Sequence, residues 1–380
     1  GSRSVMDFDF TGEQLMLQNL ARELLSREST PRQVRRWMDD SVGFDPSTWQ
    51  RMAEMGLQGL ALDPADGGQG LGMVEQALVL EEMGRAAYPG PYFATVVLAA
   101  PALNHGARKA IAEGRLKASL AFLDERLSWA PEAVTLPAAA RGGDYVLSGA
   151  KHFVPFAHVA DLILVAARRQ DDVALFQVER TAPGLSIVPT AEMDRTSKTS
   201  TLVLDEVRVP SDAIVGGAEV VRAVLRRAAV GAAAEMLGAA RRCMEMSVEY
   251  ARVRHQFGQP IGAFQAIKHA CAEMLMDVET AHAATYYAAW ALDADAPDAE
   301  LAASVAKAHV SEAARRVCGS ALQVHGGIGF TWEYDLHLYL KRAKHLEPLY
   351  GDAEFHRERA LRARLALAPE RLEARQPVPA

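Results

Sequence analysis

The sequence predicts an α+β fold: an N-terminal helical domain, a middle antiparallel β-sandwich or barrel, and a C-terminal four-helix bundle. Two observations lead to this prediction. Apolar residues recur with helical spacing before and after a central zone, in which they alternate with a period of two. In that zone turn residues, and not helices, separate the apolar runs, which argues against a Rossmann domain. The expected boundaries are 7–117, 118–217 and 218–368, followed by a tail at 369–380.

Composition limits the possible partners. The chain has 380 residues, of which 49% are hydrophobic and 23% charged, enough apolar material for two or three domains. A net charge of −7 argues against a general affinity for nucleic acids or anionic membranes. No apolar run approaches the roughly 20 residues that span a bilayer, so membrane insertion is not expected. Residues 1–5 are interpreted as an expression remnant before Met6.

The three cysteines bear on the cellular compartment. Cys243, Cys271 and Cys318 are odd in number, widely spaced and set in helical patterns. This arrangement predicts reduced, buried thiols in a cytoplasmic protein, with neither a disulfide framework nor a metal site.

Helix ends are recognisable in the first zone. Thr11, with Gln14 three residues later, forms a capping-box pattern. The helical pattern at 74–83 is expected to end at Gly84. The glycine-rich run at 67–72 precedes a helix, a place where phosphate can bind. It lacks the Lys-Ser/Thr of a P-loop and any βαβ unit around it, so we interpret it as a helix connector.

The other two zones supply strands and long helices. The predicted strands are 119–123, 145–149, 162–165, 173–178, 185–188 and 201–204. The last zone is Ala-rich, and its long helical patterns with short connectors indicate an antiparallel bundle. The predicted helices are 218–254, 264–293, 298–325, 335–346 and 352–367. Asp298 follows a proline and is expected to cap the third of these.

Residues 254–265, Arg-His-Gln-Phe-Gly-Gln-Pro-Ile-Gly-Ala-Phe-Gln, lie between two long helical patterns. A simple connector needs the Gly/Pro turn, but not the cation, the carboxamides and the two aromatic rings. The combination suits a loop that binds a large ligand through both charge and ring contacts.

Three further segments allow a structural and a functional interpretation. At 323–330, Gln-Val-His-Gly-Gly-Ile-Gly-Phe closes a helix. Gly326 alone is an ordinary helix stop, whereas several glycines together permit a backbone to approach a ligand closely. Phe153 on its own is interpreted as an aromatic residue on a half-buried strand. At 347–354 a proline ends one helix, and Asp352 can cap the next, whose N-terminus can also face a ligand.

Taken together, these segments resemble the acyl-CoA dehydrogenase family of flavoproteins. The match covers almost the whole chain and includes the order of the three zones. Its strongest parts are Arg-x-x-Phe-Gly-x-Pro-Ile-x-x-Phe-Gln at 254–265 and Gln-x-x-Gly-Gly-x-Gly-Phe at 323–330. The resemblance implies FAD-dependent α,β-dehydrogenation of an acyl-CoA thioester. A carboxylate removes the α-proton, the β-hydride passes to flavin N5, and an electron-transfer flavoprotein accepts the electrons.

The resemblance also implies that FAD binds between the subunits of a dimer, usually within a tetramer. The positions that match residues holding the adenosine and pyrophosphate from the neighbouring subunit are Arg254, Gln256, Phe257, Ile261, Phe264 and Gln265. Gln323, Gly326 and Gly327 match the segment that lies along the same pyrophosphate. A guanidinium suits this place because it pairs with phosphate in a forked geometry. Phe153 falls where the family usually has a Trp beside the isoalloxazine.

The flavin-ring end departs from the family pattern. The expected glutamate position holds Tyr350, and tyrosine, whose ordinary pKa is about 10, is a poor base at neutral pH. The position that some relatives use instead falls near Ala228, beside Ala229. After Gly351, the family's usual Thr and Gln are replaced by Asp352 and Glu354, whose carboxylates would repel a pyrophosphate.

The middle zone departs as well, and three hypotheses follow. The family's Thr-Glu-Pro-Gly-x-Gly-Ser-Asp is reduced to Asp-Glu-Arg-Leu-Ser at 124–128, and Pro155 replaces a Thr that touches the flavin. The first hypothesis is a divergent homomeric dehydrogenase with Asp352, Glu347 or Glu354 as base. The second is one subunit of an α2β2 dehydrogenase whose partner supplies the base, as known in the family for bulky substrates such as steroid side chains. The third is a flavin monooxygenase or nitroalkane-oxidase-like relative, with a non-catalytic scaffold as a further alternative; the intact 323–330 motif disfavours the monooxygenases.

Overall fold

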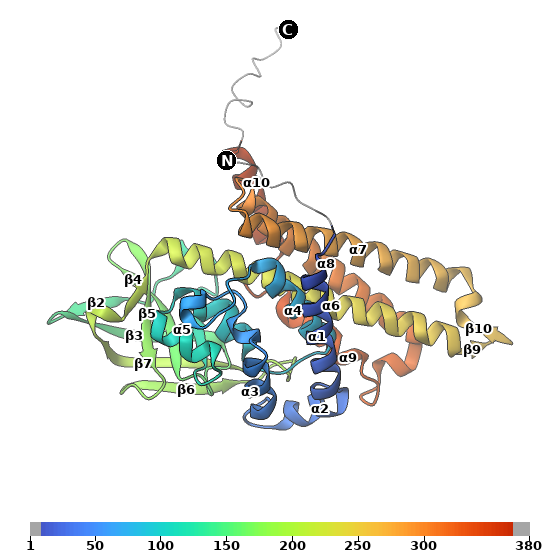
Figure 1. The fold of residues 1–380 in the computed structure, drawn as a ribbon, viewed down its shortest axis with the longest axis horizontal. Coiled ribbons are helices and arrows are strands. Elements are labelled where there is room, and N and C mark those ends of the chain that lie inside the picture. The colour runs from blue at the N-terminus through green and yellow to red at the C-terminus, as the bar shows by residue number, and fades with distance from the viewer. Residues whose placement is uncertain (1–8, 368–380) are drawn as a thin grey trace, which may run out of the picture.

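The computed structural model describes residues 9–367, which form two helical regions with a β region between them (Figure 1). The predicted α+β class is therefore confirmed. The interpreted remnant at 1–5, the first two residues of the predicted N-terminal domain, and the predicted tail at 369–380 lie outside the described residues. Within the described range, no helix combines the length and the apolar character needed to cross a membrane.

The N-terminal region consists of short helices. Its elements are α1 Gly12–Glu28, α2 Pro31–Asp39, α3 Pro46–Glu54, α4 Met73–Arg85, the π-helix η3 Phe93–Ala99 and α5 His105–Ala112. The capping box predicted for α1 is present. The Thr11 hydroxyl accepts a hydrogen bond from the Gln14 N–H at 3.2 Å, and the Gln14 side chain accepts one from the Thr11 N–H at 3.0 Å.

The prediction that Gly84 ends a helix was wrong, because α4 continues to Arg85. Gly84 serves a contact with α6 (Ala218–Val253) instead. A Cβ at Gly84 would lie 1.9 Å from the Glu235 carbonyl oxygen, and one at Gly238 would lie 1.8 Å from that of Glu81. These two glycines therefore let the backbones of α4 and α6 touch.

The glycine-rich run at 67–72 leads into α4, as the connector interpretation requires. The first N–H groups of α4 are already satisfied by a carboxylate. Asp293, the last residue of α7 (Gln265–Asp293), accepts hydrogen bonds from the Met73 N–H at 2.6 Å and the Val74 N–H at 2.9 Å. A phosphate cradle at this helix end is excluded, because the protein supplies the anion itself.

The β region contains two four-stranded sheets. Five of the six predicted runs fall within strands, and the first, 119–123, extends beyond β1, which ends at Ala121. One sheet has the order β1 (Ala118–Ala121), β4 (Leu162–Arg169), β5 (Asp172–Glu179), β8 (Ile214–Gly216); the other has the order β2 (Ala138–Arg141), β3 (Asp144–Pro155), β7 (Thr199–Val209), β6 (Leu185–Thr190). The pairs are antiparallel except β1 with β4, which are parallel. The parallel pair arises because β2 and β3 form part of the other sheet before the chain returns.

The C-terminal region is the predicted helical bundle. It comprises α6, α7, α8 (Ala299–His325), α9 (Leu336–Leu346) and α10 (Ala353–Ala366). The Asp298 side chain does not cap α8 as expected; it accepts a hydrogen bond from the Tyr287 hydroxyl at 2.7 Å. Cys243 and Cys318 are buried free thiols, as predicted, whereas Cys271 is only half-buried.

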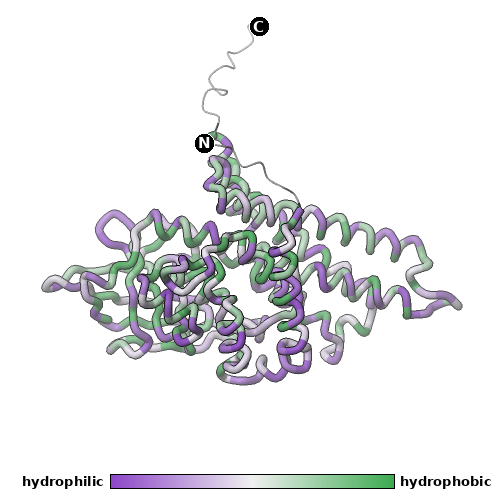
Figure 2. The backbone as a smooth tube through the Cα atoms, viewed as in Figure 1, coloured by the Kyte–Doolittle hydropathy of each residue, from purple (hydrophilic) through white to green (hydrophobic). Residues whose placement is uncertain are grey.

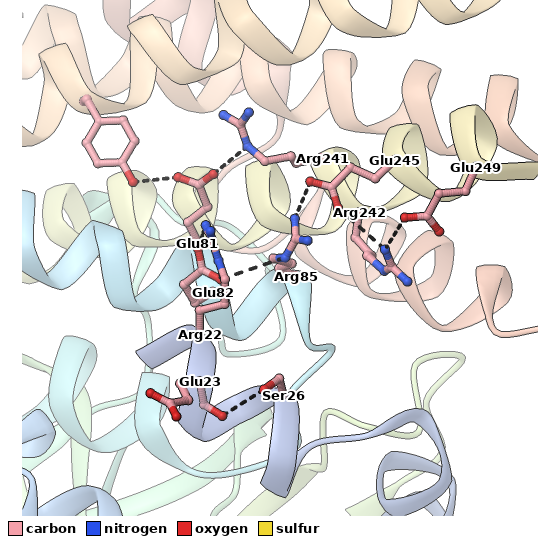
Figure 3. A network of polar contacts seen from close by, with 11 residues as sticks. Arg22, Glu23, Ser26, Glu81, Glu82, Arg85, Arg241, Arg242, Glu245 and Glu249 are labelled. Carbon is pink, nitrogen blue, oxygen red and sulfur yellow. Dashed lines mark hydrogen bonds and ion pairs between the residues drawn. The ribbon is translucent and has the colours of Figure 1, made fainter. Parts of the chain in front are cut away.

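Buried ion pairs fasten α4 to its neighbours (Figure 3). Glu81 and Glu82 of α4 are each 2% exposed. Glu82 accepts a hydrogen bond from Arg22 of α1 at 3.0 Å, and Glu81 accepts from Arg241 of α6 at 2.8 Å and from the Tyr286 hydroxyl of α7 at 2.6 Å. The network ties the N-terminal region to helices α6 and α7 of the bundle.

Candidate functional site

A cavity of about 520 Å³ lies between the β region and the segment that joins α9 to α10. Its apolar walls include Leu123, Leu127, Trp129, Phe153, Met193 and Leu349, and its polar groups include Glu192, Lys344, His345 and Asp352. The volume and the mixture of apolar walls with few polar groups are typical of small-molecule sites.

Phe153 faces this cavity because β3 is irregular there. The pairing of β3 with β7 shifts register between Lys151 and Val154, and Phe153 has a positive φ of 53°. A β-bulge of this kind redirects a side chain out of the sheet alternation. The interpretation as an ordinary half-buried strand aromatic was incomplete, because the side chain lines the cavity.

Trp129 forms a neighbouring wall that sequence reasoning did not identify. Its ring stacks on Phe122, with centroids 5.5 Å apart, and its indole N–H donates to the Pro348 carbonyl at 3.1 Å. The turn before it is anchored by Asp124, which accepts hydrogen bonds from the Thr135 N–H at 2.6 Å and the Leu136 N–H at 3.2 Å. The turn at 124–128 thus positions the indole ring of Trp129 on the cavity wall.

Tyr350 is buried beside the cavity: its neighbours Leu349 and Gly351 line the cavity, and Tyr350 itself does not. The residue is 5% exposed, and its ring lies between Phe93 at 5.2 Å and Trp129 at 4.9 Å. Burial raises the pKa of Tyr350, so its hydroxyl stays protonated at neutral pH. Ala228 and Ala229 are buried as well. Neither position expected for a catalytic base therefore carries a group that can take a proton.

Behind Tyr350 the free space shrinks to about 40 Å³, enough for one or two water molecules. A buried polar network borders it. The Arg342 guanidinium donates to Asp194 at 2.7 Å, to the Glu235 carboxylate, and to the Tyr88 carbonyl at 3.2 Å. Burial raises the pKa of Glu235, although Arg342 opposes this. The pattern of α6 gave no signal for Glu235, because a Glu in an Ala-rich helix is typical of a solvent-facing position.

The three carboxylates considered as replacement bases differ in their surroundings. The Glu347 carboxylate pairs with Arg315 and Lys344, each at 3.3 Å, and the exposed Glu354 does not line the cavity. Asp352 lines the cavity, and one of its oxygens accepts from the Phe355 N–H at 2.8 Å, the predicted N-cap of α10. Of the three, only Asp352 can contact a ligand in this cavity.

Glu192 is a further carboxylate on the cavity wall that sequence reasoning missed. Its carboxylate lies 3.6 Å from Nδ1 of His345, which also lines the cavity. The two residues come from the β region and from α9, so their proximity could not be inferred from spacing.

The loop at 254–265 lies at the opposite end of α6 (Figure 1). Arg254 and Gln256 are exposed, and Phe257 is 91% exposed. Phe264 is half-buried and meets the Phe257 ring edge-on at 6.1 Å, while Ile261 is buried. The short strands β9 (His255–Gln256) and β10 (Gln259–Pro260) form the tip of this hairpin, which is largely hydrophilic in Figure 2. The cation and one aromatic ring thus project from the molecule.

The second motif reaches the same end of the bundle. His325, the last residue of α8, stacks on Tyr250 of α6 with centroids 4.6 Å apart. Gln323, Gly326 and Gly327 are exposed, and a Cβ at either glycine would meet nothing within 4 Å. The two motifs therefore present an open backbone and a charged loop at the same end of the bundle.

The loop and the cavity cannot contact the same ligand within one chain. Ala229 of α6 borders a small space beside Trp129 and Tyr350, whereas Arg254 follows the last turn of the same helix. At a rise of about 1.5 Å per residue, the two positions are roughly 35–40 Å apart along the helix. A dinucleotide does not span that distance.

Comparison with known proteins identifies the family of the chain. Three family models match the chain: the acyl-CoA dehydrogenase N-terminal domain at residues 11–117, the middle domain at 129–207 and the C-terminal domain at 216–365. The probable acyl-CoA dehydrogenase YngJ of Bacillus subtilis is 31% identical, covering 93% of this chain and 98% of that protein. The acyl-CoA dehydrogenase IpdE2 of Mycobacterium tuberculosis is 32% identical, covering 87% and 91%.

Solved structures show the same architecture. The Tcur3481-Tcur3483 steroid ACAD G363A variant superposes with a TM-score of 0.86 at 31% identity, covering 94% of this chain and 99% of that chain. The ChsE4-ChsE5 complex from Mycobacterium tuberculosis gives a TM-score of 0.86 at 29% identity, covering 98% and 100%. The chain therefore belongs to the acyl-CoA dehydrogenase family, FAD-dependent oxidoreductases that act on CH–CH groups.

Proposed function

We propose that this chain is one subunit of a heteromeric α2β2 acyl-CoA dehydrogenase. Its 254–265 loop contacts an FAD shared with a partner chain, and the partner supplies the catalytic base. The observation that carries the proposal is Tyr350, which stands where the family's glutamate is expected. Buried between Phe93 and Trp129, it cannot accept a proton, and it leaves only about 40 Å³ behind it.

The residues present fit the adenosine and pyrophosphate half of FAD. The exposed guanidinium of Arg254 can pair with phosphate, and the exposed ring of Phe257 can cover an apolar ligand face. Gly326 and Gly327 leave open space beside the backbone. When bound, the flavin supplies the hydride acceptor; the protein supplies binding and orientation.

The residues of the cavity fit a flat aromatic ring, and neither position at which the family carries its base holds a carboxylate in this chain. Phe153 and Trp129 offer ring faces, and the volume of about 520 Å³ admits a tricyclic ring. At the N-terminus of α10, Asp352 already takes the Phe355 N–H, so this helix end offers less to a phosphate. The partner's residues would complete the reaction.

Two of the structural neighbours support a two-chain assembly by their names: the Tcur3481-Tcur3483 steroid ACAD and the ChsE4-ChsE5 complex. We propose by analogy that the substrate is a bulky acyl-CoA such as a steroid side-chain thioester, and that an electron-transfer flavoprotein accepts the electrons. The free thiols of Cys243 and Cys318 support a cytoplasmic location.

Co-expression tests the proposal. The chain is purified alone and together with candidate partner chains encoded near it, and the flavin absorbance and molecular mass of each sample are measured. We expect little bound FAD in the chain alone, and a tetramer with bound FAD and acyl-CoA-dependent bleaching when the partner is present. A chain that alone binds a full complement of FAD and is bleached by an acyl-CoA under anaerobic conditions would refute the heteromer.

A matched pair of variants tests the loop. Arg254→Gln removes the guanidinium expected to contact the pyrophosphate, whereas Arg252→Gln removes an exposed guanidinium two residues earlier. In the assembled complex, Arg254→Gln is expected to weaken FAD binding by about tenfold or more, which corresponds to a lost charge-assisted hydrogen bond. Arg252→Gln should leave FAD binding unchanged. Equal effects of the two variants would remove the argument for a specific contact.

A homomeric dehydrogenase is the second candidate, because Asp352 lines the cavity. Asp352→Asn keeps the helix cap while removing the base, since asparagine is an equally good N-cap. If the homomeric chain is active, this variant should lose activity, while Glu354→Gln, which alters a carboxylate outside the cavity, should not. Retained activity in Asp352→Asn would exclude Asp352 as the base.

A further inference from the structure

The segment 347–351, which joins α9 to α10, is held by an unusual set of side-chain donors. Lys307 of α8 is fully buried, and its ammonium donates to the Glu347 carbonyl at 2.9 Å and to the Gly351 carbonyl at 2.8 Å. Its third contact is the Ser311 hydroxyl at 3.1 Å. The hydrogen bonds of this buried ammonium thus go to two main-chain carbonyls and a hydroxyl, and none goes to a carboxylate. Lys307 therefore holds the backbone of the 347–351 segment in place.

Two more side-chain donors bind main-chain carbonyls that lie between those of Glu347 and Gly351. His356, 5% exposed, lies with Nε2 at 2.9 Å from the Tyr350 carbonyl. Because a carbonyl only accepts, Nε2 carries the proton. The Trp129 indole donates to the Pro348 carbonyl at 3.1 Å. Four of the five carbonyls of the 347–351 segment are therefore bound by side chains from three separate elements.

The backbone that these donors hold is strained. Tyr350 has a φ of +62°, a conformation that residues other than glycine rarely adopt, and Gly351 has a φ of +102°. Such conformations persist only where the surroundings enforce them, and they are often found at functional sites. Here Pro348, Leu349 and Gly351 of this segment line the cavity, and Tyr350 lines a smaller separate space of about 40 Å³.

We propose that Lys307 and His356 are positioning residues that hold the 347–351 segment in its left-handed conformation, and so shape the wall that the cavity presents to a flavin ring. The contribution to flavin binding rests on the proposed function; the hold on the segment does not. Burial lowers the pKa of Lys307 to about 7 and that of His356 to about 4, so the pair brings at most one charge to the site at neutral pH.

Hydrogen exchange on the purified chain tests the hold itself. Lys307→Met keeps the length and removes the donors, Lys307→Gln keeps N–H donors, and Lys268→Met alters an exposed lysine of α7 as a control. Loss of two carbonyl partners should raise exchange in the peptide 347–352 by about tenfold in Lys307→Met. We expect partial recovery in Lys307→Gln and no change in the control. Unchanged exchange at 347–352, or an equal rise throughout α6 and α8, would overturn the proposal.

His356 gives an independent pair of variants. His356→Phe removes the donor to the Tyr350 carbonyl, and His356→Gln can replace Nε2 by an amide N–H. The first should loosen 347–352 selectively and the second should restore its protection. If both variants behave alike, the histidine acts only by filling space and the positioning role is refuted.

Flavin binding gives the functional readout. In the assembled complex, Lys307→Met is expected to weaken FAD binding about tenfold and to shift the visible absorption band of the bound flavin, with the tetramer intact. A normal spectrum and affinity, together with a loosened segment, would refute the contribution to the cavity wall. If the unmodified complex binds no FAD, the proposed function fails, and the exchange experiment still decides whether Lys307 and His356 hold the segment.

Discussion

Truncation of Tyr350 gives a quantitative test of how tightly its ring is packed. The ring lies between Phe93 and Trp129, with spaces of about 40 and 20 Å³ on its flanks. Tyr350→Ala would open on the order of 100 Å³ more, and at about 24 cal/mol per Å³ the cavity term is about 2–3 kcal/mol. The lost transfer free energy brings the expected cost in the free energy of unfolding to about 3–5 kcal/mol.

The backbone at this position refines the prediction. Because Tyr350 has a φ of +62°, alanine retains the strain and glycine relieves it. The free energy of unfolding of Tyr350→Gly should therefore exceed that of Tyr350→Ala by about 0.5–1 kcal/mol, although glycine normally destabilises a protein relative to alanine.

Urea unfolding followed by circular dichroism measures these differences, and thermal shift with benzene or indole tests the new cavity. A ligand at a hundredfold excess over its Kd should return about 2.7 kcal/mol to the truncated variants and nothing to the parent. A cost below about 1 kcal/mol, a less stable glycine variant, or no ligand effect would refute the close packing and the backbone strain inferred for Tyr350.

Three further predictions concern titratable side chains. Arg342→Met leaves Asp194 and Glu235 without their cation and should reduce the free energy of unfolding by about 3–5 kcal/mol in urea titrations, with part of the loss restored by adding Glu235→Gln. Burial lowers the pKa of His356 from 6.5 to about 4, so between these pH values the unfolded chain binds a proton at His356 and the folded chain does not. The free energy of unfolding should therefore fall by about 3 kcal/mol from pH 6.5 to pH 4. His356→Phe should flatten that part of the stability profile. Asp293→Ala removes the acceptor at the N-terminus of α4 and should cost about 1–2 kcal/mol, while Asp293→Asn should cost less; an equal loss in both would argue against capping.

Local signals in the sequence predicted the elements well. Periodicity separated the helical and β regions, and the capping residues Thr11 and Asp352 act as expected. Gly84 misled the prediction, because a glycine that ends a helix and one that admits a neighbouring helix look alike in a single sequence. Only the contact with Glu235 distinguishes them.

The interior of the site was beyond reach of local patterns. Trp129 and Tyr350 are neighbours in space but come from the β region and from the end of the bundle. Lys307 lies in an Ala-rich helix, where a lone lysine is typical of a solvated face, yet it is fully buried. The family resemblance identified Tyr350 as an unusual residue, but it could not indicate which side chains hold it.

The carboxylates of α4 have a consequence for how the chain acquires its fold. Glu81 finds its cation in Arg241, 160 residues later in the sequence, and the bare backbone of Gly84 is covered only by α6. A fragment ending at residue 117, at the end of the matched N-terminal family domain, would expose an unpaired acidic side chain and an unfilled groove on its central helix. The boundary of the matched family domain therefore separates residues that pack against each other in the folded chain. During synthesis on the ribosome, α4 must wait for α6 and α7 to emerge before the N-terminal region can reach its final packing.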